Sequence, residues 1–76
     1  MKSFQQLVSE ELANARAKHR GLNTKHEALA VIMEEFEEFK EAVFRDMPTE
    51  ESLKELIQLA AMCQRAAEDV GLIAAQ

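Results

Sequence analysis

The chain has 76 residues, and its 14 Asp and Glu side chains outnumber its 9 Lys and Arg, for a formal net charge of −5. Proteins that bind a nucleic-acid backbone are usually basic, so this balance argues against nucleic acid as a partner. No apolar run approaches the roughly 20 residues of a membrane-spanning helix, and residues 1–6 lack the apolar stretch of a signal peptide. We therefore expect a cytoplasmic protein that binds neither nucleic acid nor membrane.

The small size of the chain limits how it can be stabilised. A single domain of this length buries only about 60% of its unfolded surface, and small domains usually add disulfides, a metal ion or a partner chain. Cys63 is the only cysteine, so an internal disulfide is excluded, and a lone thiol suits a reducing compartment. Metal binding or oligomerisation remains as the additional source of stability.

Periodic apolar residues predict three helices, over residues 3–18, 24–46 and 49–70. Each start has a capping signal: a capping box at Ser3 and Gln6, a second one at Thr24 and Glu27, and Thr49 as N-cap. Pro48 and Gly71 mark the ends of the second and third helices. The stripes expected to face the core are Phe4, Leu7, Val8, Leu12 and Ala15; Leu29, Ile32, Phe36, Phe39 and Val43; and Leu53, Leu56, Leu59, Ala60, Cys63, Ala67 and Val70.

We therefore predict an all-α fold: residues 1–76 form one domain, a three-helix antiparallel unit that assembles into an oligomeric helical bundle. On the second helix, apolar residues also lie on both flanks of the main stripe, with Val31 and Ala42 on one side and Met33 and Phe44 on the other. A three-helix monomer cannot readily cover all of them, so a homodimer or homotetramer is expected.

The acidic residues of the second and third helices fall into two groups. Most lie on a charged outer face, which needs no functional explanation. Glu35 and Glu55 instead project at the margins of apolar stripes, where an unpaired carboxylate would be costly or would change its pKa. Glu38 and Gln58 each follow three residues later, on the same side of their helices.

Two helices joined by a short turn usually lie antiparallel. That packing would bring Glu35 and Glu38 close to Glu55 and Gln58. Three carboxylates and an amide are a hard-oxygen ligand set suited to Mg²⁺, with Mn²⁺ possible. The alternative is an ordinary Glu-rich surface, because glutamate pairs at this spacing are common.

Two segments resemble the MazG-like all-α NTP pyrophosphatase superfamily: residues 26–39, HEALAVIMEEFEEF, and residues 55–62, ELIQLAAM. That superfamily carries E-x-x-E on one helix and E-x-x-D on the next. Glu35-x-x-Glu38 matches the first motif and Glu55 begins the second, but Gln58 stands where the family has aspartate. The substitution removes one negative charge from the site.

The resemblance implies a Mg²⁺-dependent enzyme that cleaves a nucleoside triphosphate to a nucleoside monophosphate and pyrophosphate. Glu35, Glu38 and Glu55 would be catalytic metal ligands, and Gln58 would supply a further oxygen. The family also tends to form dimers or tetramers. A competing hypothesis, favoured by Gln58, is a non-catalytic helical oligomerisation or adaptor protein that keeps the MazG-like fold.

A local group of basic residues surrounds the first interhelical loop. Lys18, Lys25 and His26 are candidates to bind the phosphates of a nucleotide substrate. Basic residues at the end of a helix also interact favourably with its dipole, which is sufficient to explain Lys18.

Overall fold

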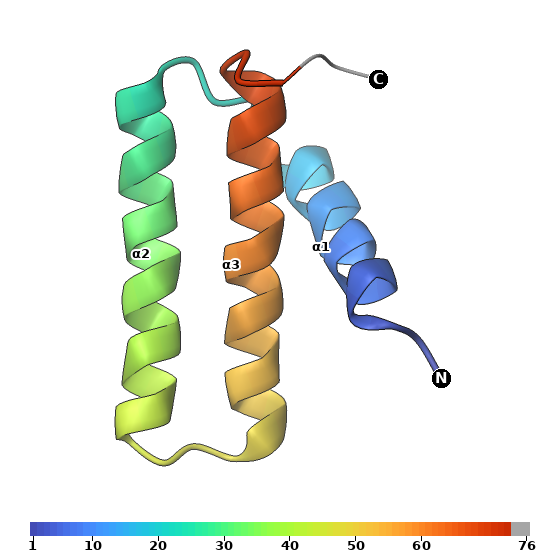
Figure 1. The fold of residues 1–76 in the computed structure, drawn as a ribbon, viewed down its shortest axis with the longest axis vertical. Helices are drawn as coiled ribbons and strands as arrows, with labels where there is room; N and C mark the ends of the chain where they lie inside the picture. Colours follow the sequence, from blue (N-terminus) through green and yellow to red (C-terminus); the bar gives the residue numbers. More distant parts are fainter. Residues whose placement is uncertain (74–76) are drawn as a thin grey trace.

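Three α-helices follow one another with short connections in the computed structural model, which describes residues 1–73 (Figure 1). They are α1 (Phe4–Lys18), α2 (Lys25–Phe44) and α3 (Thr49–Asp69). Successive helices run in opposite directions, and α3 packs against both α1 and α2. The all-α, three-helix prediction is confirmed. Within residues 1–73, none of the helices has the length and apolar character needed to cross a bilayer.

Two of the three predicted helix caps form. The capping box at the start of α1 is complete: the Ser3 hydroxyl accepts from the Gln6 N–H and the Gln6 side chain accepts from the Ser3 N–H. Thr24 caps α2 by accepting from the Glu27 N–H at 3.0 Å, but the Glu27 carboxylate accepts from the Asn23 N–H instead of completing a box.

The prediction of Thr49 as an N-cap is wrong. The cap position is Pro48, which makes no side-chain hydrogen bond, and Thr49 is the first helical residue. The second helix also ends at Phe44, two residues earlier than predicted, because Asp46 adopts a φ of 53° that a helix cannot continue. Gly71 has a φ of 74° and lies just beyond α3, as the sequence predicts.

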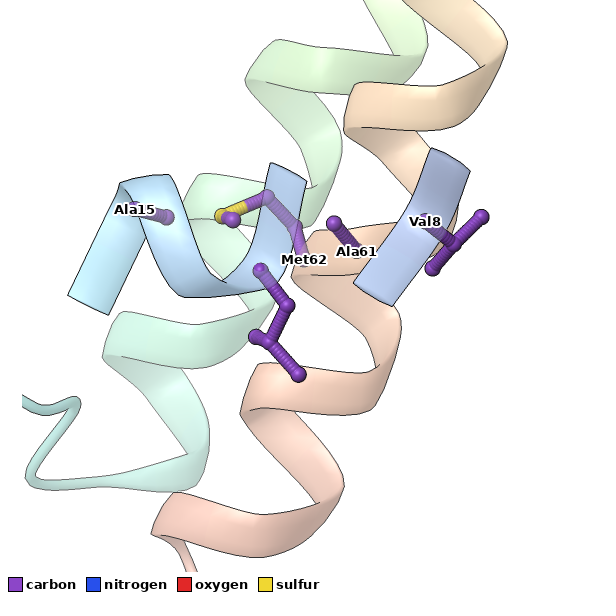
Figure 2. Close-up of a cluster of buried hydrophobic side chains, with 5 residues drawn as sticks. Val8, Ala15, Ala61 and Met62 are labelled. Atoms are coloured by element: carbon purple, nitrogen blue, oxygen red, sulfur yellow. The ribbon is translucent and has the colours of Figure 1, made fainter. Parts of the chain in front are cut away.

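Two small clusters of buried side chains hold the helices together. In the first, Val8, Leu12 and Ala15 of α1 pack on Ala61 and Met62 of α3 (Figure 2). The second cluster joins the first loop to α2 and α3; its buried members are Leu22, Ala28 and Ala66. Both clusters depend on alanines, which let the helix backbones approach closely.

The predicted core stripe of α2 is confirmed only in part: Ile32 and Phe39 are half-buried, and Ile32 packs against both buried clusters, but the other three members are exposed. Leu29, Phe36 and Val43 are 55%, 50% and 50% exposed, whereas Ala28 and Ala42 are buried. Residues seven apart share a helix face, so the buried stripe runs 28-35-42 and the exposed stripe 29-36-43. The stripe 28-35-42 consists of two alanines and Glu35, so it is less hydrophobic than the stripe 29-36-43. A prediction from hydrophobicity therefore selects the exposed stripe.

The predicted stripe of α3 is also confirmed only in part: four members are half-buried, while Leu53 and Leu56 are exposed. The half-buried members are Leu59, Ala60, Ala67 and Val70. Its buried residues are Ala61, Met62, Arg65 and Ala66. Cys63, expected to be a buried structural thiol, is exposed. Met33 and Phe44, on the flank of α2 that a three-helix monomer was not expected to cover readily, are both exposed.

Asp69, near the end of α3, ties this helix to the chain before α2. One carboxylate oxygen accepts from the Arg16 guanidinium at 2.8 Å, and the other accepts from the Leu22 N–H at 2.9 Å. The buried Arg65 side chain lies 3.7 Å from the same carboxylate and donates to the carbonyl of Arg20. Burial favours the protonated acid, but the hydrogen bonds from Leu22 and Arg16 outweigh it, and the pKa of Asp69 is lowered.

We predict that Asp69→Asn destabilises the protein near neutral pH by about 1–2 kcal/mol, since the substitution leaves Arg65 without its charged partner. Because the pKa of Asp69 is lowered below its ordinary 3.8, its contribution is present above that pH and is lost as the pH falls through the folded-state value. Urea unfolding of both proteins from pH 7 downward measures this.

Glu68→Gln is the control, since Glu68 also pairs with Arg16 but is more exposed, and its effect should be smaller. A wild-type advantage that grows on acidification would contradict the assignment.

Candidate metal centre

Three carboxylates meet in the groove between α2 and α3. Glu35 and Glu38 lie one turn apart on α2, and Glu55 faces them from α3. One oxygen of each lies within 4.8 Å of the others. The proximity predicted from the sequence is confirmed, while the role of these residues as metal ligands stays a prediction.

Glu35 has the most perturbed environment of the three. One of its oxygens, Oε2, is buried and has no hydrogen-bond partner among residues 1–73. Burial, then the charge of Glu38 and a hydrogen bond shared with it, and then the charges of Glu55 and Glu11 raise the pKa of Glu35 to about 7. Near neutral pH this carboxyl therefore holds a proton for part of the time, unless a cation replaces that proton.

Burial and the neighbouring Glu38 also raise the pKa of Glu55, while the ammonium of Lys54 partly opposes the shift. Two carboxylates from different helices are thus perturbed by the same third carboxylate. This coupling indicates a concentrated negative field in the groove.

The cluster lies between two hollows. The first is a groove of about 360 Å³ lined by Glu38, Glu55 and Gln58, together with Lys54 and Arg45. Gln58 is half-buried and lines the same groove as Glu38 and Glu55. The groove thus joins Glu38 and Glu55 to the uncharged Gln58, while Glu35 does not contribute to its lining.

The second hollow, of about 500 Å³, is lined by residues of α1, the first loop, α2 and α3. Glu35, Lys18 and Arg65 contribute to its lining. Of the residues predicted to bind phosphate, Lys18 therefore lies beside the cluster. Lys25 and His26 are exposed in the first turn of α2 and line neither hollow.

Three contributors to this site were missed in the sequence. Glu11 is half-buried on α1, and its charge adds to the pKa shift of Glu35. Arg65 is buried beneath the second hollow, and Lys54 reaches Glu55 electrostatically. No local pattern marks Glu11 or Arg65, because their positions depend on how α1 and the first loop pack against α3. Lys54 directly precedes Glu55, so its electrostatic effect on Glu55 could have been predicted from the sequence.

The donor set fits a hard divalent cation. All candidate ligands are oxygens: three carboxylates and the Gln58 carbonyl, which suit Mg²⁺ or Mn²⁺ better than soft metals. The unpartnered Glu35 Oε2 is the atom most in need of a cation or a proton.

Comparison with protein-family models, curated proteins and solved structures gives no significant match. The fold and the site together define the class of molecule: a three-helix all-α domain with a glutamate cluster between two antiparallel helices.

The pKa of Glu35 predicts an unusual pH dependence. Its folded-state pKa of about 7 lies above the ordinary 4.5, so the stability that its protonated form contributes is complete below 4.5 and is lost as the pH rises through about 7. In metal-free buffer, Glu35→Gln should therefore melt a few degrees above wild type near pH 8 and at nearly the same temperature near pH 4.5. Thermal unfolding in EDTA measures both. An equal difference at the two pH values would contradict the burial of this charge.

Divalent cations should offset the destabilisation that the ionised Glu35 carboxylate causes. Mg²⁺ or Mn²⁺ should raise the melting temperature of wild type by mass action, an effect worth about 2.7 kcal/mol at 100 times the dissociation constant. The increase should shrink in Glu35→Gln and Glu55→Gln. Glu37→Gln serves as control, because Glu37 is an exposed carboxylate of the same helix that does not belong to the cluster. The metal-site assignment fails if all four proteins are stabilised equally.

Proposed function

We propose that the protein is a Mg²⁺-dependent nucleoside triphosphate pyrophosphohydrolase, which releases pyrophosphate and a nucleoside monophosphate. The observation that carries the proposal is the meeting of Glu35, Glu38 and Glu55 from two helices, within 4.8 Å and beside two hollows. The choice of NTP cleavage comes from the resemblance of the two glutamate motifs to the MazG-like superfamily.

In this proposal the chain supplies a rigid oxygen-ligand set. Glu35 and Glu38 are on one helix, so their relative position is set by a single turn of α2. Glu55 approaches from α3, and its position depends on the packing of the two helices. Gln58 contributes an amide oxygen at the edge of the same groove.

A bound Mg²⁺ supplies charge neutralisation for phosphate oxygens and a lowered pKa for an attacking water. The chain's own contribution to phosphate binding is cationic. Lys18 reaches the hollow that Glu35 lines, and Lys54 lines the groove that Glu38 and Glu55 line. Each cation is thus placed to attract a phosphate chain lying across the acidic cluster.

The second candidate is the non-catalytic adaptor, and Gln58 favours it. Replacing an acidic ligand with an amide lowers the affinity of the site for a dication, since an amide oxygen carries no net charge. Under this alternative the glutamate cluster remains as part of an inherited fold and turns over no nucleotide.

The decisive experiment measures pyrophosphate and orthophosphate separately, with Mg²⁺ and a panel of NTPs and dNTPs. We expect pyrophosphate from at least one nucleotide. Glu38→Ala should reduce turnover about 100-fold or more while circular dichroism shows an unchanged helical content, because Glu38 is exposed and packs little. Glu37→Ala, one residue away and outside the cluster, should retain activity.

Gln58→Asp separates the two candidates further. Restoring the charge should tighten Mg²⁺ binding by about tenfold, and it should increase or preserve pyrophosphate release. If both wild type and Gln58→Asp are inert across the panel, the adaptor hypothesis is correct.

A further inference from the structure

The second hollow has the size and the lining of a small-molecule pocket. Its volume is about 500 Å³, and ligand pockets usually measure about 300–1,000 Å³ and are largely apolar. Ala15, Leu22 and Met62 contribute buried apolar side chains to its lining, and Val31 contributes a half-buried one. An apolar lining of this kind suits the face of a flat ring.

The loop that forms one wall of the hollow is held in place by hydrogen bonds. The Leu22 N–H donates to Asp69 at 2.9 Å, and the Asn23 N–H donates to Glu27 at 2.7 Å. The Arg20 guanidinium pairs with the same Glu27 carboxylate at 2.9 Å. A wall that is fixed before a ligand arrives loses less conformational entropy on binding.

Arg65 lines the hollow and has donor capacity that the chain does not use. It is only 5% exposed, and its Nη2 donates to the carbonyl of Arg20. Its Nη1 donates to the sulfur of Met62 at 3.5 Å, and its Nε has no hydrogen-bond partner among residues 1–73. Arginine has five N–H donors, and a thioether sulfur is a weak acceptor. A ligand oxygen that replaces the sulfur at Nη1 would therefore satisfy this buried group better.

The charges around the hollow favour a neutral ligand group over an anion. Its lining contains three cations and three carboxylates: Lys18, Arg20 and Arg65, and Glu27, Glu34 and Glu35. A free anion would meet as much repulsion as attraction. Arg65 on α3 can only donate hydrogen bonds, and the ionised Glu34 on α2 can only accept them. A ligand that offers both an acceptor and a donor fits these two walls.

We propose that the second hollow holds the base of the nucleotide and prefers a base in which a carbonyl adjoins a ring N–H, as in guanine, uracil and thymine. The carbonyl accepts from Arg65, the ring N–H donates to Glu34, and the ring packs on the apolar lining. Adenine has no carbonyl, and cytosine has no ring N–H beside its carbonyl, so each leaves one of the two side chains unpaired. The choice of a nucleotide as ligand rests on the proposed function.

A titration of isotope-labelled protein with GMP, UMP, AMP and CMP, without metal, tests the proposal by nuclear magnetic resonance. These ligands share ribose and phosphate and differ only in the base. GMP or UMP should shift the amide signals of Leu22 and Val31 and bind about tenfold or more tightly than AMP and CMP. Equal affinity for all four, no binding at millimolar concentration, or shifts confined to Ala42 and Met47 in the first groove would each overturn the proposal.

Glu34→Ala should remove most of the preference over cytosine, and the fold should survive because Glu34 is exposed. Glu37→Ala is the matched control, since Glu37 is an exposed carboxylate of the same helix that does not line the second hollow. Arg65→Lys keeps the charge but loses the planar group, and it should weaken GMP and UMP binding more than AMP binding. An unchanged preference in Glu34→Ala contradicts the assignment even if Arg65→Lys does not fold.

The base preference and the proposed function can fail separately. Pyrophosphate release from all nucleotides with the same KM would leave the proposed function in place and overturn the base preference. Binding of GMP or UMP in the second hollow without pyrophosphate release from any nucleotide would support the base preference and contradict the proposed function.

Discussion

Helices α2 and α3 approach each other through small side chains, with Ala28 and Ala42 buried on one helix and Ala66 on the other. Larger residues at these positions would hold the backbones apart. Glu35 lies midway between the two alanines of α2, two turns from each, and therefore points at α3 by geometry alone. The close packing of small residues is thus what brings Glu35 within reach of Glu55. Several larger apolar side chains, among them Leu29 and Phe36, remain exposed.

This arrangement concentrates negative charge where water is partly excluded. Burial and mutual repulsion raise the pKa of Glu35 to about 7 and also raise that of Glu55. A domain this small has little stability to lose, so a partly buried cluster of like charges is costly unless a cation or a proton compensates it. The Arg16–Asp69–Arg65 network shows the opposite arrangement, in which each buried charge has a partner of opposite sign.

The two sides of the α2–α3 pair differ in chemistry. One side carries the carboxylates, the cations Lys18 and Lys54 and the two hollows. The other side carries the exposed stripe that includes Leu29 and Phe36. Helix α1 packs against α3, and its residues Ala15 and Lys18 help to line the hollow that Glu35 also lines.

The sequence alone was sufficient to predict the three helices and the proximity of the three glutamates. Capping residues and breakers act locally, so Ser3, Thr24 and Gly71 could be interpreted without knowledge of the tertiary structure. The i, i+3 spacing and a short connection were likewise enough to bring Glu35, Glu38 and Glu55 together.

Which face of each helix is buried was decided only by the tertiary structure. Periodicity identifies two adjacent stripes on α2, and hydrophobicity favours the one with Leu29 and Phe36, yet the helices pack through the stripe with Ala28 and Ala42. Two helix backbones can approach closely only where the side chains between them are small. This requirement belongs to the pair of helices and cannot be recognised in either helix alone. The burial of Arg65 and the effect of Glu11 on the pKa of Glu35 could not be predicted from the sequence either. Both depend on where α1 and its loop pack against α3.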